Sequence, residues 1–222
     1  MRILAAGGIG GISAGIAVAA LQHVTTTPLI LSAEVYETAQ HLHQHAAEAI
    51  APVAESLRRT AMTSLSTIVA SIGYAFVLLA GMLFAGERIT ARRAALWGVC
   101  AFAATGLAPA IGLAPQLPGA AETDLAGRQL WWVATAATTG TGLYAILRFD
   151  DRLAQAFGLF LIIAPHLFTP TPALPESTVP AELAARFAAA SLVLQAIAWT
   201  LAGALAGMTY CAIAGEKEDA PA

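Results

Sequence analysis

The chain has 222 residues, of which 58% are hydrophobic and 11% charged, and its formal net charge is −3. A soluble domain carries about 25% charged residues, so this composition excludes an ordinary soluble protein and predicts an integral membrane protein. The slightly acidic balance, without a basic tract, argues against a nucleic-acid partner. At this length we expect a single integral membrane domain over 1–222.

Six apolar stretches contain no Asp, Glu, Lys or Arg. They run over about 3–22, 61–86, 94–113, 129–147, 153–168 and 187–215. A helix needs about 20 apolar residues to cross a bilayer, and charge inside the bilayer is strongly disfavoured. We therefore predict an all-α, polytopic membrane bundle of six transmembrane helices. The fifth stretch is short and Pro165 interrupts its end, so a re-entrant fifth segment with five crossings is the alternative.

The first stretch has some features of a secretory signal, because Arg2 precedes it and Ala17-Val18-Ala19 resembles a cleavage site. However, Gly7, Gly11 and Gly15 recur every four residues. That spacing is typical of a small-residue face on which membrane helices pack tightly. We therefore predict that this stretch is a helix of the bundle.

The connection 23–60 is expected to be a long outer loop. It holds four of the five histidines, and His166 follows Pro165 at the same end of the fifth stretch. Threading the six stretches through a bilayer places seven Lys and Arg residues on one side and four on the other. Since the cation-rich side is cytoplasmic, both termini are predicted inside and all the histidines outside.

A run of alternating histidines lies in this predicted loop, at His41, His43 and His45. In an extended chain all three side chains project from one face, and in a helix the first and third share a face. Neutral imidazole with carboxylate suits Co, Ni, Zn or Cu. The spacing matches no closed structural zinc site, so we predict loose metal capture. The alternative is a polar loop in which the histidines are incidental.

A firmer metal site is predicted at the outer ends of the first and fifth helices, from His23 and His166 with Glu34 or Glu37. Metal ligands work best when rigid elements hold them, and the clustered histidines would then act as a collector. Alternatively, His166 only caps a helix and His23 lies at the membrane interface. The complete set of predicted metal ligands is His23, Glu34, Glu37, His41, His43, His45 and His166.

An internal repeat links the outer ends of the odd-numbered stretches. Each unit has a proline at the end of a helix, an outer loop, and then an acid four residues before an arginine. The prolines are Pro28, Pro109 and Pro165, and the acid–arginine pairs are Glu55–Arg59, Asp124–Arg128 and Glu182–Arg186. The pattern predicts three parallel helical-hairpin pseudo-repeats around a pseudo-threefold axis. The charged residues can pair on one helix face, either as interfacial anchors or in a binding role.

The remaining notable residues are predicted to have structural roles, and no catalytic site is predicted. Trp131 and Trp132 are typical of an interfacial aromatic belt, while Cys100 and Cys211 are expected to be packing residues. The sequence has no phosphate-binding loop and no nucleophile–base constellation. We therefore predict no enzyme activity, no catalytic or cofactor-binding residues and no tightly bound cofactor.

Several motifs together resemble the CbtA family of predicted cobalt transporter subunits, over nearly the whole chain. They include Gln22-His23, Ala33-Glu34-Val35-Tyr36-Glu37, Ala91-Arg92-Arg93, Arg128-Gln129-Leu130-Trp131-Trp132, Pro165-His166 and Val179-Pro180-Ala181-Glu182-Leu183-Ala184-Ala185-Arg186-Phe187. The chain departs from the family in its modest histidine loop, which has no Asp among the clustered histidines.

The resemblance implies a multi-pass protein of the bacterial cytoplasmic (inner) membrane that imports Co²⁺ for cobalamin biosynthesis. Ni²⁺, which the same ligand types suit, is the alternative ion. The resemblance also implies a partner, a small single-span membrane subunit rich in histidine. The competing hypothesis is a non-transporting membrane scaffold or a chaperone that only presents metal ions. An intramembrane enzyme is the third hypothesis.

Overall fold

The computed structural model describes residues 1–41, 53–118, 124–170, 177 and 179–215, and over these residues it contains helices and no β-strand. The all-α prediction is therefore confirmed for the described part of the chain. Of the predicted metal ligands, His43 and His45 lie outside the described residues.

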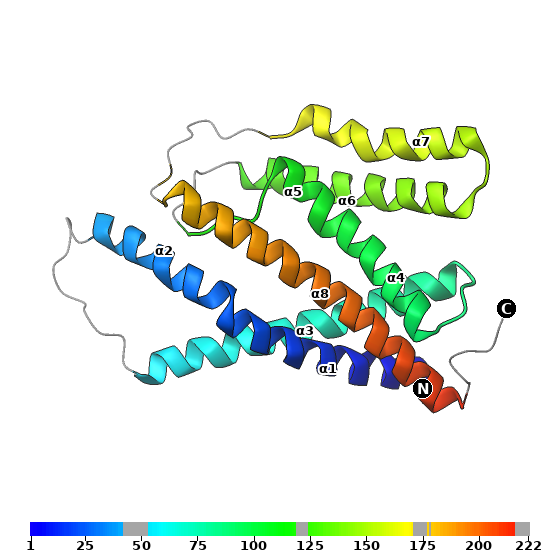
Figure 1. Ribbon diagram of the computed structural model, residues 1–222, viewed down its shortest axis with the longest axis horizontal. Helices are drawn as coiled ribbons and strands as arrows, with labels where there is room; N and C mark the ends of the chain where they lie inside the picture. The colour runs from blue at the N-terminus through cyan, green and yellow to red at the C-terminus, as the bar shows by residue number, and fades with distance from the viewer. Residues whose placement is uncertain (42–52, 119–123, 171–176, 178, 216–222) are drawn as a thin grey trace. The chain divides into compact units, whose positions relative to one another are not determined.

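All six predicted stretches are helical (Figure 1). In chain order the elements are α1 (Arg2–Val24), α2 (Thr26–His41), α3 (Val53–Phe84), α4 (Ala91–Phe102), the π-helix η1 (Ala103–Leu107), α5 (Ala108–Gly112), α6 (Leu125–Arg148), α7 (Arg152–Ile163), the 3-10 helix η2 (Ala164–Phe168) and α8 (Ala181–Ala214).

Four helical segments among the described residues are long and apolar enough to cross a bilayer. They are Arg2–Val24, Leu57–Phe84, Ala91–Gly112 and Ala181–Ala214. The segment Arg152–Phe168 is apolar but shorter, and the threonine-rich α6 does not belong to this set. The chain is thus a multi-pass membrane protein, while the count of six crossings remains a prediction.

The expectation that 23–60 is a loop is wrong for much of its length. Helix α2 occupies Thr26–His41, and α3 begins at Val53, before the predicted start of the second stretch. Pro28 lies in the first turn of α2, where its missing N–H would have no helical partner in any case. Good helix formers such as Ala33 and Glu34 follow it, so the proline begins a helix here instead of only ending one.

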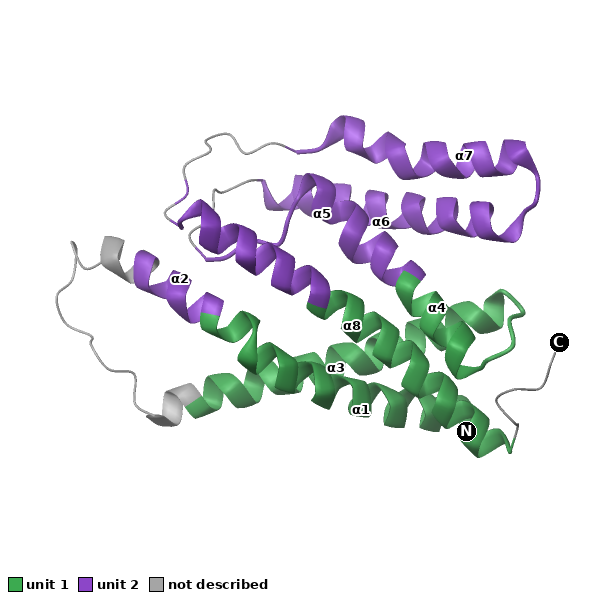
Figure 2. Ribbon diagram, viewed as in Figure 1, with its two compact units in different colours: residues 1–28, 39–99, 194–222 green, residues 29–38, 100–193 purple. Residues whose placement is uncertain are grey.

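The chain divides into two compact units (Figure 2). Unit 1 comprises residues 1–28, 39–99 and 194–222, and unit 2 comprises residues 29–38 and 100–193. The divisions fall within α2, α4 and α8, so each of these helices contributes to both units. The single membrane domain over 1–222 remains a prediction.

In unit 1, α1 packs on α3 through the predicted glycine face. A methyl group added at Gly11 or Gly15 would lie 2.5 Å from the Cα atom of Ile72 or Ile68, and Gly7 is equally confined by an aromatic ring. No real side chain fits at such a distance, so the two backbones are in close contact. The prediction of a small-residue packing face is confirmed.

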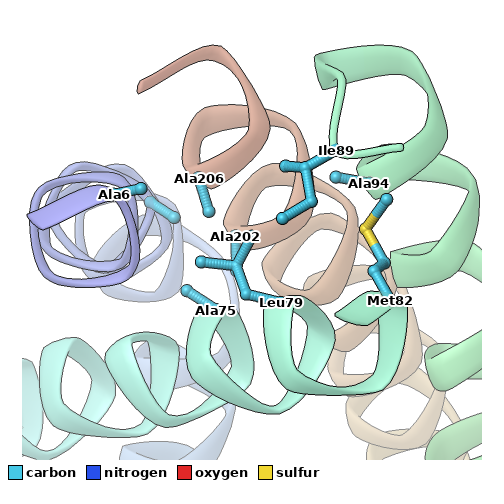
Figure 3. Packing of buried hydrophobic residues seen from close by; sticks show 9 residues of the cluster. Ala6, Ala75, Leu79, Met82, Ile89, Ala94, Ala202 and Ala206 are labelled. Carbon is cyan, nitrogen blue, oxygen red and sulfur yellow. The ribbon is translucent and has the colours of Figure 1, made fainter. Parts of the chain in front are cut away.

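Alanines make up most of the buried cluster at the centre of unit 1. Ala6 of α1, Ala75 and Leu79 of α3, and Ala202 and Ala206 of α8 are fully buried in one cluster (Figure 3). Such residues let helices approach closely and gain dispersion energy, which drives helix association in a bilayer. Next to this cluster the thiol of Cys211 donates to the carbonyl of Ile89 at 3.3 Å. This buried contact agrees with the predicted packing role of the cysteine.

Candidate metal-contact site

The site in unit 2 is organised by the start of α6. The carboxylate of Asp124 accepts a hydrogen bond from the amide of Gly127 at 2.8 Å and so caps the helix. Asp124 is therefore an N-cap that precedes the helix. The cap places Trp131 and Trp132 in the second turn of α6.

Trp132 hydrogen bonds to an irregular part of the preceding helix. Pro109 has no N–H, so the carbonyl of Thr105, four residues earlier, cannot accept the usual α-helical bond from it. The chain forms the π-helix η1 around Thr105, and the indole N–H of Trp132 donates to this carbonyl at 3.1 Å. Trp132 remains 43% exposed, which is compatible with the predicted aromatic belt.

Trp131 faces the interior of unit 2 and is only 7% exposed, so its assignment to the aromatic belt is wrong. Its indole N–H donates to the carbonyl of Pro165 at 2.9 Å. Its ring meets the imidazole of His166 edge to face, with centroids 5.9 Å apart. A methyl group added at Gly112 would lie 2.6 Å from the indole, so α5 confines the ring as well. The two tryptophans thus hold the segments at Pro109 and Pro165.

His166 lies in η2 and has an unusual environment. Both ring nitrogens are buried, and neither has a hydrogen-bond partner among the described residues. Within the described part of the chain, the ring therefore donates to no helix carbonyl. A neutral imidazole offers one donor and one acceptor, and leaving a buried polar group unpaired costs about 1–3 kcal/mol. An orphaned imidazole suits a transition-metal ion.

Two further polar residues of unit 2, Thr135 and Thr139 of α6, are not among the predicted metal ligands. Both are buried, and their hydroxyl groups have no hydrogen-bond partner in the described part of the chain. They follow Trp131 at steps of four residues and so share its helix face. That spacing was the available signal.

The other predicted ligands lie on α1 and α2. His23 is exposed in the last turn of α1, next to Gln22, whose amide oxygen accepts from the hydroxyl of Thr67 at 2.8 Å. Because α2 is helical, positions 34, 37 and 41 are three and four residues apart and line one helix face. Glu34 itself is partly buried. The side chains of Glu37 and His41 lie outside the described ones.

The described predicted ligands are divided between the two units. His23 and His41 belong to unit 1, whereas Glu34, Glu37 and His166 belong to unit 2. Among the described residues no group of three or more His, Cys, Asp or Glu side chains could hold a metal ion. The ligand set therefore remains a prediction.

The acid–arginine pairs differ from one another. Glu182 and Arg186 form an ion pair at 2.6 Å, with exposed side-chain fractions of 77% and 68%, and such exposed pairs contribute little stability. Asp124 caps α6, as described above. The side chain of Glu55 lies outside the described ones. The predicted pairing is thus confirmed for Glu182–Arg186.

Helices of these lengths and compositions define a multi-pass helical membrane protein. A family model described as "Probable cobalt transporter subunit (CbtA)" matches residues 1–210. The chain therefore belongs to the CbtA family of probable cobalt transporter subunits. Comparisons with curated proteins and with solved structures give no significant match.

Proposed function

We propose that this protein is the membrane subunit of an uptake system for divalent metal ions, Co²⁺ or alternatively Ni²⁺. It captures the ion at the outer face and passes it inward. The observation that carries the proposal is His166, an imidazole with two buried, unpartnered nitrogens in a chain of a probable cobalt transporter family. Borderline divalent ions favour this ligand.

The structure suggests how His166 is kept ready for an ion. Trp131 fixes η2 by donating to Pro165, the residue before His166, and its ring packs on the imidazole. Both contacts hold the ring in place without using its nitrogens. A ligand held by packing and neighbouring hydrogen bonds loses little entropy when it binds a metal.

The remaining ligands in this proposal lie on or after α1 and α2. His23 follows the last apolar turn of α1, and the helix face of Glu34, Glu37 and His41 leads to His43 and His45. A neutral imidazole is required for metal binding, so protons compete with the ion. These residues would gather ions at the outer face, and His166 would receive them.

We propose the remaining architecture from the sequence. The bundle has six transmembrane helices, arranged as three parallel hairpin pseudo-repeats, in a bacterial cytoplasmic (inner) membrane with both termini in the cytoplasm. The proline segments support the repeat in part, because both Pro109 and Pro165 stand in the first turn of a short helical segment. The partner is a small single-span subunit rich in histidine, and the imported ion supplies cobalamin biosynthesis.

The second candidate is a membrane scaffold or chaperone that presents metal ions without transporting them. It is favoured by the lack of three clustered ligands among the described side chains. Vesicles reconstituted with the protein, with and without the His-rich partner, separate the two functions. With an inward Co²⁺ gradient, the transport proposal predicts that labelled Co²⁺ enters the lumen when both subunits are present. Labelled ion that binds to the vesicles without entering them would favour the scaffold.

A further inference from the structure

The hydroxyl groups of Thr135 and Thr139 differ from those of their neighbours on α6. Thr138 and Thr141 each donate to the carbonyl four residues before them at 2.8 Å, which is a common way for a helical threonine to satisfy its hydroxyl. Thr135 and Thr139 are 0% and 3% exposed, yet neither hydroxyl has such a partner among the described residues. They are therefore free to bind something else.

These two threonines lie on a defined face of unit 2. The buried residues of α6 are Trp131, Thr135, Thr139 and Gly142, and their spacing of four, four and three residues puts them on one helix face. Each step of four residues advances about 6 Å along the axis. At the far end a methyl group added at Gly158 of α7 would lie 2.6 Å from the carbonyl oxygen of Gly142. The backbones of α6 and α7 therefore meet at this point and close the face.

The near end of the same face is the contact between Trp131 and His166. The indole donates to the carbonyl of Pro165 and packs against the imidazole, whose nitrogens are buried without partners. The imidazole of His166, from η2, therefore lies at the Trp131 end of this face. The hydroxyls of Thr135 and Thr139 follow along α6, and the backbone contact at Gly142 ends the face. We name His166, Thr135 and Thr139 the α6 polar row.

We propose that the α6 polar row is the inward continuation of the metal site. A divalent cation that leaves His166 keeps part of its water shell, and those water molecules hydrogen bond first to the hydroxyl of Thr135 and then to that of Thr139. This inference rests on the proposed function and specifies its route, from the imidazole along α6 as far as Thr139.

The chemistry of the row matches such an ion better than a purely structural role. A hydroxyl both donates and accepts, so it can bind water on a cation, and an imidazole binds Co²⁺ or Ni²⁺ directly. A hydroxyl kept unpaired in an apolar interior only destabilises the fold. Valine has nearly the shape of threonine without the hydroxyl, so a structural role predicts that valine is tolerated at both positions.

The test compares uptake, binding and stability in the double variant T135V/T139V, reconstituted with the partner under an inward Co²⁺ gradient. We expect uptake to fall about 10-fold or more, equivalent to about 1.4 kcal/mol. The melting temperature should be unchanged or higher, and Co²⁺ binding by calorimetry should stay close to that of the wild type. The variant T138V, whose hydroxyl is already bonded within the helix, is the matched control and should transport normally.

The double serine variant T135S/T139S keeps both hydroxyls and should restore uptake. Normal uptake by the double valine overturns the proposal, and so does a loss of uptake that the double serine shares. Failure of the proposed function is seen separately, because in that case wild-type vesicles take up no Co²⁺ even with the partner present.

Discussion

Replacing Trp131 by phenylalanine tests how the site is held. The variant loses the hydrogen bond of 2.9 Å to the carbonyl of Pro165 but keeps an aromatic ring beside His166. The lost hydrogen bond costs about 0.5–1.5 kcal/mol, and the space left by the smaller ring adds about 1 kcal/mol. We therefore expect a loss of about 1.5–2.5 kcal/mol in the free energy of unfolding, measured by denaturant titration in mixed micelles followed by circular dichroism.

The matched control is Trp132→Phe. It removes a similar hydrogen bond, to the carbonyl of Thr105 at 3.1 Å, but the side chain is 43% exposed. Surface changes usually cost about 0.5 kcal/mol or less, so we expect a much smaller loss. Co²⁺ affinity should fall in Trp131→Phe, because His166 loses its support, and stay normal in the control. Equal effects of the two variants on stability and affinity would refute the role assigned to Trp131.

The remaining predictions concern packing, topology and capture. Gly11→Ala places a methyl group 2.5 Å from the Cα atom of Ile72 and should destabilise the α1–α3 contact by about 1–3 kcal/mol. Gly8→Ala, with nothing within 4 Å of the new methyl group, should be neutral or stabilising in the same unfolding assay, and equal losses would contradict the packing. Gln44→Cys, in a variant without the native cysteines, should react with an impermeant thiol reagent in intact cells. Labelling only after lysis would reverse the orientation. Replacing the three clustered histidines by alanine should slow Co²⁺ uptake at low ion concentration more than at saturation, and an equal reduction at both would exclude a collector role.

The sequence predicted the helices well where the signal was local. The length of an uncharged stretch can be read directly from the sequence, and all six predicted stretches are helical. The spacing of Gly7, Gly11 and Gly15 likewise predicted a real helix contact, because the 3.6-residue period determines which residues share a face. Helix α2 was missed because Pro28 was read as the end of a helix, although a proline is also well tolerated in the first turn of the next one.

The candidate site was predicted less completely, because the contacts of its side chains depend on which helices pack together in the folded chain. Neighbouring residues on a helix point about 100° apart, so the burial of Trp131 and the exposure of Trp132 depend on which side of α6 the other helices cover. The spacing of Thr135 and Thr139 from Trp131 was visible in the sequence. However, only the packing of unit 2 shows that their hydroxyls lack partners. The isolation of both nitrogens of His166 depends in the same way on tertiary structure.

Calorimetric titration of Co²⁺ into wild-type protein, His166→Ala and Thr138→Val tests the central claim most directly. Thr138 already donates to the carbonyl of Ala134, so its variant controls for the effect of a substitution in unit 2. We expect His166→Ala to weaken Co²⁺ binding about 10-fold or more, equivalent to at least about 1.4 kcal/mol, and Thr138→Val to bind normally. An unchanged affinity in His166→Ala would contradict the account, because the buried imidazole would then not contact the ion.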